Sequence, residues 1–327
     1  MTATIEELVT DPTATEMTES GLLVPAQRQL PWASLVTGSS QDGETLTSQE
    51  LLQRAGLDWD TRIRPLTRRM NDGTIQDHPW ARETYRSDNE APLGVVRKVY
   101  NPYSNRDVFA FGDHVAANGQ GRWCHAGIQG TDYVRVFMTM ELAEFQVFGS
   151  DPYKLYLFFR TSHDGGMGLK AYVVPIRVWC TNQQQLVTEH HQGYWTVEHT
   201  GTLERRLEEA RESLEQVVEY STEFNALAEK LVATTVSDQK VRSVLSRLVP
   251  EGRARRDDII ADLKHTYQTS ETVEPYRGTA YGLLNAVTEY YDHGKKQQNG
   301  NARFESIMFG EGAKARRAVL RDLAHLN

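Results

Sequence analysis

Hydrophobic and polar residues alternate most clearly between Tyr153 and Asn182, in the segment YKLYLFFRTSHDGGMGLKAYVVPIRVWCTN. Two runs rich in Val, Ile, Phe and Tyr flank the turn-forming triplet Asp164-Gly165-Gly166. This pattern predicts a β-hairpin closed by a two-residue turn, either Asp164-Gly165 or Gly165-Gly166. Because side chains alternate along a strand, the length of the turn decides which residues of the two strands share a face.

With a two-residue turn, one face of the hairpin is apolar and the other mixes cations with aromatic rings. We expect the first face to lie in the core, and its residues are Tyr153, Leu155, Leu157, Phe159, Tyr172, Val174, Ile176 and Val178. The second face contains Lys154, Tyr156, Phe158, Arg160, Ala171, Val173, Pro175, Arg177 and Trp179, and Lys170 lies beside it. Such a face suits single-stranded DNA, whose bases stack on rings while its phosphates pair with Lys and Arg. The alternative is an ordinary sheet face covered by a helix.

Similar patterns predict the elements before and after the hairpin. Caps and a glycine stop predict helices over 46–56 and 105–118, and β-rich runs predict strands over 59–66, 94–100, 122–130 and 132–142. The polar stretch with Pro79 and Pro92 reads as a loop or a small excursion. Thr181-Asn182 can cap a helix that reaches His190 and covers the sheet.

The character of the chain changes after Gly201. Helical periodicity begins at 202–235 and continues over 237–248, 254–267, 277–292 and 311–325. These patterns predict an α+β fold, in which helices cover a central antiparallel meander and the C-terminal region is helical. The expected organisation is an acidic tail over 1–30, an α+β core over 31–200 and a helical region over 201–327.

Composition limits the classes of function. The chain has 327 residues and a net charge of -8, which argues against a dedicated duplex-DNA clamp but permits a local basic surface. No apolar run is long enough to span a bilayer, the first residues do not resemble a signal peptide, and Cys124 and Cys180 look like buried thiols. We therefore expect a cytoplasmic protein without a membrane partner.

Catalytic signatures are weak. Ser162-His163-Asp164 is best explained as a hairpin tip, because three consecutive residues do not form a catalytic relay by themselves. His190, His191 and His199 match no metal-ligand spacing, so we predict no catalytic residue, metal or cofactor. A hydrolase or nuclease would require Asp292, His293 and His199 to converge.

Several short segments together resemble the phage and plasmid proteins grouped as domain-of-unknown-function 932. They are Ala55-Gly56-Leu57-Asp58-Trp59, Ser162-His163-Asp164-Gly165, Pro175-Ile176-Arg177-Val178-Trp179-Cys180-Thr181-Asn182, Glu198-His199-Thr200 and Ala286-Val287-Thr288-Glu289-Tyr290-Tyr291-Asp292-His293. The resemblance implies a role in DNA handling in a bacterial host and specifies no activity.

The expected architecture is also similar to the core of Rad52-type single-strand annealing proteins. That similarity implies a homo-oligomer, such as a ring, with single-stranded DNA in a basic groove beside the hairpin. Since residues 181–192 contain no Lys or Arg, Arg205, Arg206 and Arg211 on the following helix would supply the groove. The leading hypothesis is single-strand DNA binding or annealing, and a structural or regulatory protein that binds another protein is the alternative.

Overall fold

The computed structural model describes residues 29–110, 112–117, 119–147, 151–178 and 222–324, together with 16–17, 23–24, 194–196, 212, 217 and 220. Residues 16–17 and 23–24 form a separate pair of strands, β1 (Glu16–Met17) and β2 (Leu23–Val24). Most of the predicted tail over 1–30, and the predicted helix after Thr181, lie outside the described residues.

The centre of the molecule is a six-stranded antiparallel sheet with the order β11-β10-β9-β8-β7-β3. Its strands are β3 (Val36–Ser39), β7 (Arg122–Gln129), β8 (Arg135–Val147), β9 (Asp151–Ser162), β10 (Lys170–Arg177) and β11 (Tyr194–Thr196). Consecutive strands from β7 to β10 pair with one another, so the predicted meander is confirmed.

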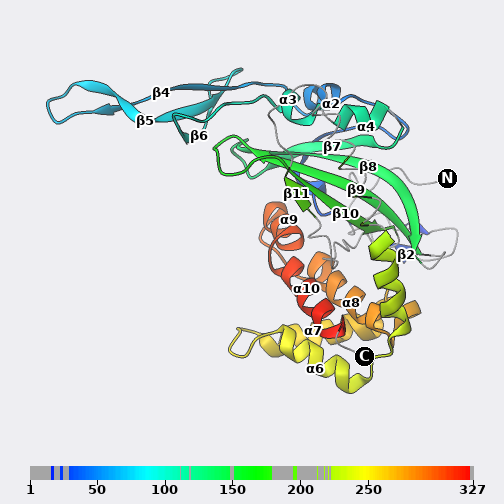
Figure 1. Cartoon of the computed structure of the whole chain (residues 1–327). Helices are drawn as coiled ribbons and strands as arrows, with labels where there is room; N and C mark the ends of the chain where they lie inside the picture. The colour runs from blue at the N-terminus through cyan, green and yellow to red at the C-terminus, as the bar shows by residue number, and fades with distance from the viewer. Residues whose placement is uncertain are drawn as a thin grey trace.

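Short helices cover one face of this sheet (Figure 1). They are α2 (Ser48–Arg54), α3 (Asn105–Phe109) and α4 (Gly112–Ala117). Thr47 begins α2 with a capping box, in which its side chain accepts from Glu50 N and the Glu50 carboxylate accepts from Thr47 N. Trp123 fills the interface between helices and sheet, where its ring meets Phe109 and Phe159 edge-on.

Helices of the C-terminal region lie on the other side of the sheet (Figure 1). Residues 222–233 are helical, and the later elements are α6 (Asp238–Leu248), α7 (Arg256–Thr269), η2 (Glu274–Tyr276), α8 (Ala280–Glu289), η3 (Tyr290–Gly294), α9 (Gly300–Met308) and α10 (Glu311–Ala324). Phe304 of α9 packs on Phe137 and Phe158 of the sheet. The fold is α+β with a helical C-terminal region, as predicted.

A three-stranded sheet forms a long arm that leaves the body beside the helical layer (Figure 1). Its strands are β4 (Thr61–Arg69), β5 (Ile75–Arg86) and β6 (Pro92–Arg97), in the order β4-β5-β6. The prediction of a loop between 66 and 94 is therefore wrong, because Ile75–Arg86 of that stretch pairs as strand β5 with both β4 and β6.

Two further predictions need correction. The helix expected over 105–118 is divided into α3 and α4. Helix α9, which covers the second face of the sheet, had no counterpart among the predicted elements, since Gly300 and two asparagines weaken its helical pattern. None of the described helices combines the length and apolar character that crossing a bilayer requires.

Candidate nucleic-acid interface

The predicted nucleic-acid face of the β9–β10 hairpin is not a single exposed surface. The pairing register joins Arg160 to Lys170 and Phe158 to Tyr172, so even-numbered residues face even-numbered residues. The strands are separated by residues 163–169 instead of a two-residue turn. A two-residue turn would have paired even with odd positions, and the predicted face was therefore wrong: Arg177 lies opposite Tyr153, on the other face from Lys154 and Arg160.

Two aromatic members of the predicted face, Tyr156 and Phe158, are buried. Tyr156 is 1% exposed and Phe158 is 0% exposed, in a cluster that α9 closes with Phe304 and Met308. Phe158 stacks on Phe137 with their ring centroids 5.2 Å apart. The alternative of a helix-covered sheet face is correct here, and these two rings are not accessible to a base.

The cations of that face are held by neighbouring side chains. Lys154 lies 3.5 Å from both Glu141 and Glu144, and the Arg160 guanidinium stacks 3.6 Å from the centre of the Phe309 ring. Lys170 is half-buried at the start of β10.

Arg177 is buried and links the sheet to the helical region. Its Nε donates to both carboxylate oxygens of Asp151 at 2.8 Å, and its Nη1 donates to the carbonyl of Thr272. A guanidinium in this position stabilises the fold and does not face solvent. Trp179, Arg205, Arg206, Arg211, His190, His191 and His199 lie outside the described residues.

The other chemical candidates have structural partners. His163 is fully buried, with Nε2 2.9 Å from Asn105 Oδ1 and Nδ1 2.8 Å from the hydroxyl of Thr61. Ser162 donates to Asp164 at the start of the turn, which confirms that this motif forms a hairpin tip. Asp292 forms a buried ion pair with Arg316 at 2.9 Å.

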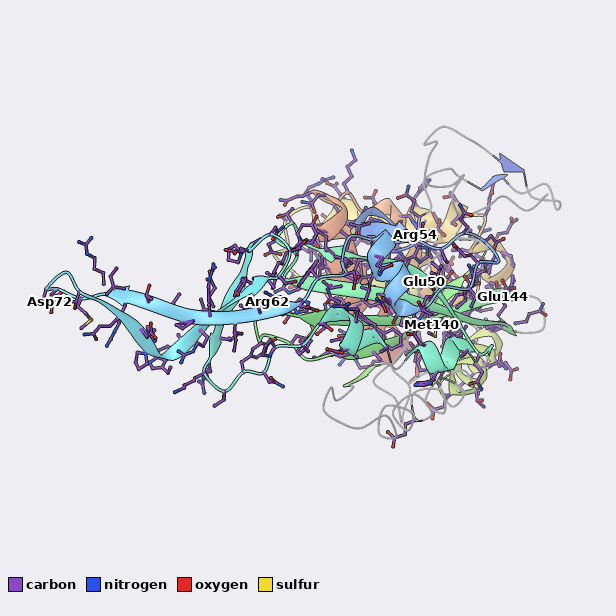
Figure 2. The ribbon with its side chains drawn as sticks, turned by 90° about the horizontal axis from the view of Figure 1, so that it is seen from above. Glu50, Arg54, Arg62, Asp72, Met140 and Glu144 are labelled. Atoms are coloured by element: carbon purple, nitrogen blue, oxygen red, sulfur yellow. The ribbon has the colours of Figure 1, made fainter. Side chains whose placement is uncertain are left out.

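The arm presents a more accessible surface than the hairpin. Figure 2 shows Arg62 near its base and Asp72 at its far end, with the ribbon between them projecting beyond the body. A turn closes this end, where Gly73 adopts a positive φ of 87° and the Asp72 carboxylate accepts from both the amide and the hydroxyl of Thr74.

Aromatic and polar contacts fix the base of the arm. The Arg86 guanidinium lies 4.9 Å from the ring centre of Trp59 and 4.4 Å from that of Tyr133, and it also pairs with Asp88. Thr61, which faces Arg86 across the strands, reaches the buried ring of His163. The arm is therefore attached to the body through buried side chains.

Charge distinguishes the arm from the rest of the molecule. Residues 61–100 contain eight Lys or Arg and five Asp or Glu, a net charge of +3, whereas the whole chain has a net charge of -8. Arg64 pairs with Glu83 and Glu90. Within the described part of the chain, no carboxylate forms an ion pair with Arg62, Arg68, Arg69, Arg97 or Lys98, and all five are exposed.

Exposed apolar side chains also gather on the arm. Of the six large hydrophobic residues that are exposed among the described residues, five belong to this segment: Ile63, Ile75, Trp80, Val95 and Val99. Trp80 is 62% exposed, and its ring meets His78 edge-on at 4.5 Å. An exposed tryptophan among unpaired cations is a combination found where proteins bind single-stranded nucleic acids.

Comparison with known proteins identifies a family and no relative of known activity. The family described as Domain of unknown function (DUF932) matches residues 92–318, which is more than half of the chain. This protein belongs to the DUF932 family. No curated protein and no solved structure matches the chain.

The DUF932 match covers strands β7 to β11 and most of the helical region, but only part of the arm. It begins at Pro92, the first residue of β6, so strands β4 and β5 lie outside it. The interpretation of the arm therefore depends on the residues of this chain and not on the family.

Sequence reasoning predicted the two outer strands of the arm, over 59–66 and 94–100, but missed β5 and the arm that it completes, because both faces of the arm are largely exposed. An exposed ribbon has no alternation of apolar and polar residues, and Pro79 favoured a loop. Arg62 and Arg64 at alternate positions, followed by Asn71-Asp72-Gly73, were the available signal for a basic hairpin.

Proposed function

We propose that this protein binds single-stranded DNA through the β4–β5–β6 arm. The observation that carries the proposal is a group of five exposed cations, on a projecting ribbon of an acidic protein, that form no ion pair with any residue the structure describes. Such cations can neutralise the phosphates of a nucleic acid, and this contact favours binding because it releases condensed counterions. The acidic body would keep the strand on the arm by repelling it elsewhere.

Single-strand annealing in an oligomer is the more specific form of this proposal. Its support is the DNA-handling role implied by this chain's resemblance to phage and plasmid proteins of the family, and the antiparallel meander that resembles Rad52-type cores. An annealing protein would form a defined oligomer and would accelerate pairing of complementary strands. Light scattering and a strand-pairing assay test these two points.

The binding experiment compares two variants that remove the same charge. The arm variant is Arg62→Gln/Arg68→Gln/Arg69→Gln, and the control is Arg242→Gln/Lys264→Gln/Arg317→Gln, which changes exposed cations on α6, α7 and α10. Fluorescence anisotropy with a labelled strand of about 40 nucleotides measures the affinity from low to high salt.

We expect the arm variant to bind on the order of tenfold more weakly. A plot of the logarithm of its binding constant against the logarithm of the salt concentration should have a slope about two units shallower, since each of the three lost phosphate contacts contributes about 0.7. The control variant should bind like the natural protein. Equal loss in both variants, or no binding at low salt, would contradict the proposal.

A protein-binding role is the second candidate function. Its support is the group of exposed apolar residues on the arm, since such patches often mark protein contacts. A defined oligomer whose assembly requires Ile63 and Val95, without any affinity for nucleic acid, would favour it.

A further inference from the structure

We infer that Trp80 is the base-stacking residue of the arm, and that Lys98 and Arg82 hold the phosphates beside the stacked base. The inference rests on the proposed function, because it assigns a binding site within the same arm. Such a site would make the arm prefer single strands, because a base stacks on an indole only when no neighbouring base covers the face of its ring.

The strand register places these three side chains on one face. Ala81 pairs with Arg97, and the amide of Lys98 donates to the carbonyl of Trp80 at 2.8 Å, so the register continues by one residue. Residues directly opposite each other on antiparallel strands point to the same side, with Cβ atoms about 5 Å apart. Lys98 therefore lies beside Trp80, and Arg82 follows Trp80 on the same face of β5.

The position of Trp80 leaves room for a ligand. Val96 is on the same face nearer the base, where it is buried against Gly165 of the β9–β10 turn. Trp80 lies just beyond this contact and is 62% exposed, whereas Trp32, Trp59 and Trp123 are at most 3% exposed. The indole is thus at the point where the ribbon leaves the body.

The charges around Trp80 indicate which ligand it would stack on. Among the described residues, Lys98 forms no ion pair, and the side chain of Arg82 donates only to the backbone carbonyls of His78 and Ala81. An apolar protein segment would gain nothing from these cations. A nucleotide offers a flat ring for the indole and an anionic phosphate for Lys98 and Arg82.

Substitution of Trp80 separates stacking from charge. Trp80→Ala should weaken binding of a labelled thymidine oligonucleotide about tenfold to a hundredfold, and Trp80→Phe should restore most of the affinity. Because no charge is removed, the salt slope should stay that of the natural protein. Ile75→Ala, which removes another exposed apolar side chain from the arm, is the matched control and should bind normally.

Intrinsic fluorescence gives a second readout that does not depend on affinity. Saturating oligonucleotide should quench the tryptophan emission of the natural protein, and Trp80→Phe should lose this quenching. Circular dichroism confirms that each variant is folded.

The outcomes distinguish this inference from the proposed function. If the arm cations matter but Trp80→Ala binds like the natural protein, or if the quenching persists in Trp80→Phe, the stacking site is refuted and single-strand binding remains. If the natural protein binds no strand at low salt, both are refuted, and assembly through the exposed apolar residues becomes the better account.

Discussion

At the scale of single residues, the hairpin shows that a shift of one position in strand register changes which side chains share a face. The alternating residues of β9 and β10 were predicted correctly as strands. Their shared faces were wrong, because the connection over 163–169 pairs Arg160 with Lys170. A shift of one residue in register moves every side chain of one strand to the opposite face. In the observed register Phe158 lies under α9, and Arg177 lies on the opposite face of the hairpin against Asp151.

Replacement of Phe158 tests this correction. Phe158→Ala should lower the free energy of unfolding by roughly 3 to 5 kcal/mol, because it leaves a cavity among Phe137, Tyr172 and Phe304. Urea unfolding followed by circular dichroism measures the change. Folded Phe158→Ala should bind single strands normally, and a loss of binding with little loss of stability would mean that the ring faces solvent.

A buried histidine makes stability depend on pH. Burial, with a smaller effect of Arg122, lowers the pKa of His125 from 6.5 to about 4. Between these values the unfolded chain binds a proton that the folded protein does not. Acidification from pH 7 to 4 should therefore reduce the free energy of unfolding by up to roughly 3 kcal/mol through this residue.

The variant His125→Asn isolates this effect. Its amide oxygen can accept from Thr139 as Nδ1 of His125 does in one tautomer, but it does not titrate. Urea unfolding at several pH values should show a smaller loss of stability on acidification than in the natural protein. An identical pH dependence would show that His125 already takes up its proton in the folded state.

At the scale of elements, capping residues in the sequence predicted where helices begin, because a helix cap depends only on neighbouring residues. The Thr47 cap and the Ser237 cap begin helices where the sequence indicates them, because each side chain accepts from the backbone amide three residues later. The arm depends on pairing between strands that are both exposed, and that pairing leaves no hydrophobic pattern. Its partner strand β5 was consequently predicted as a loop.

The distal arm should be removable without unfolding the protein. In the variant that replaces Leu66–Ala81 by Asn-Gly, a type I′ turn would join Pro65 to Arg82, which already face each other. Only Ala81 among the removed residues is buried, so the melting temperature should change by a few degrees at most.

Binding of single strands should be strongly reduced in this shortened variant, because Arg68, Arg69 and Trp80 are absent. Anisotropy and thermal melting measure the two properties on the same sample. Unchanged affinity would place the binding surface on the body, and a large fall in melting temperature would show that the arm supports the fold.

At the scale of the whole molecule, the structure separates a stabilising body from a projecting basic arm. The α+β class, the meander and the helical C-terminal region were predictable, because their hydrophobic periodicities differ. How α9 packs against the sheet, and α10 against α8 and α9, was not, since contacts between distant segments depend on register and on side-chain shape. The proposed site belongs to the arm, which the DUF932 match covers only from Pro92 onward.

The location of the bound strand is the most direct test of the central claim. Ultraviolet crosslinking of the natural protein to a thymidine oligonucleotide, followed by mass spectrometry of the digested adducts, identifies the residues in contact. We predict adducts in the peptides of β5 and β6, with Trp80 as the main site, and their loss at high salt. Adducts confined to the six-stranded sheet or to the helical region, or no adducts under conditions where the strand is bound, would contradict the account.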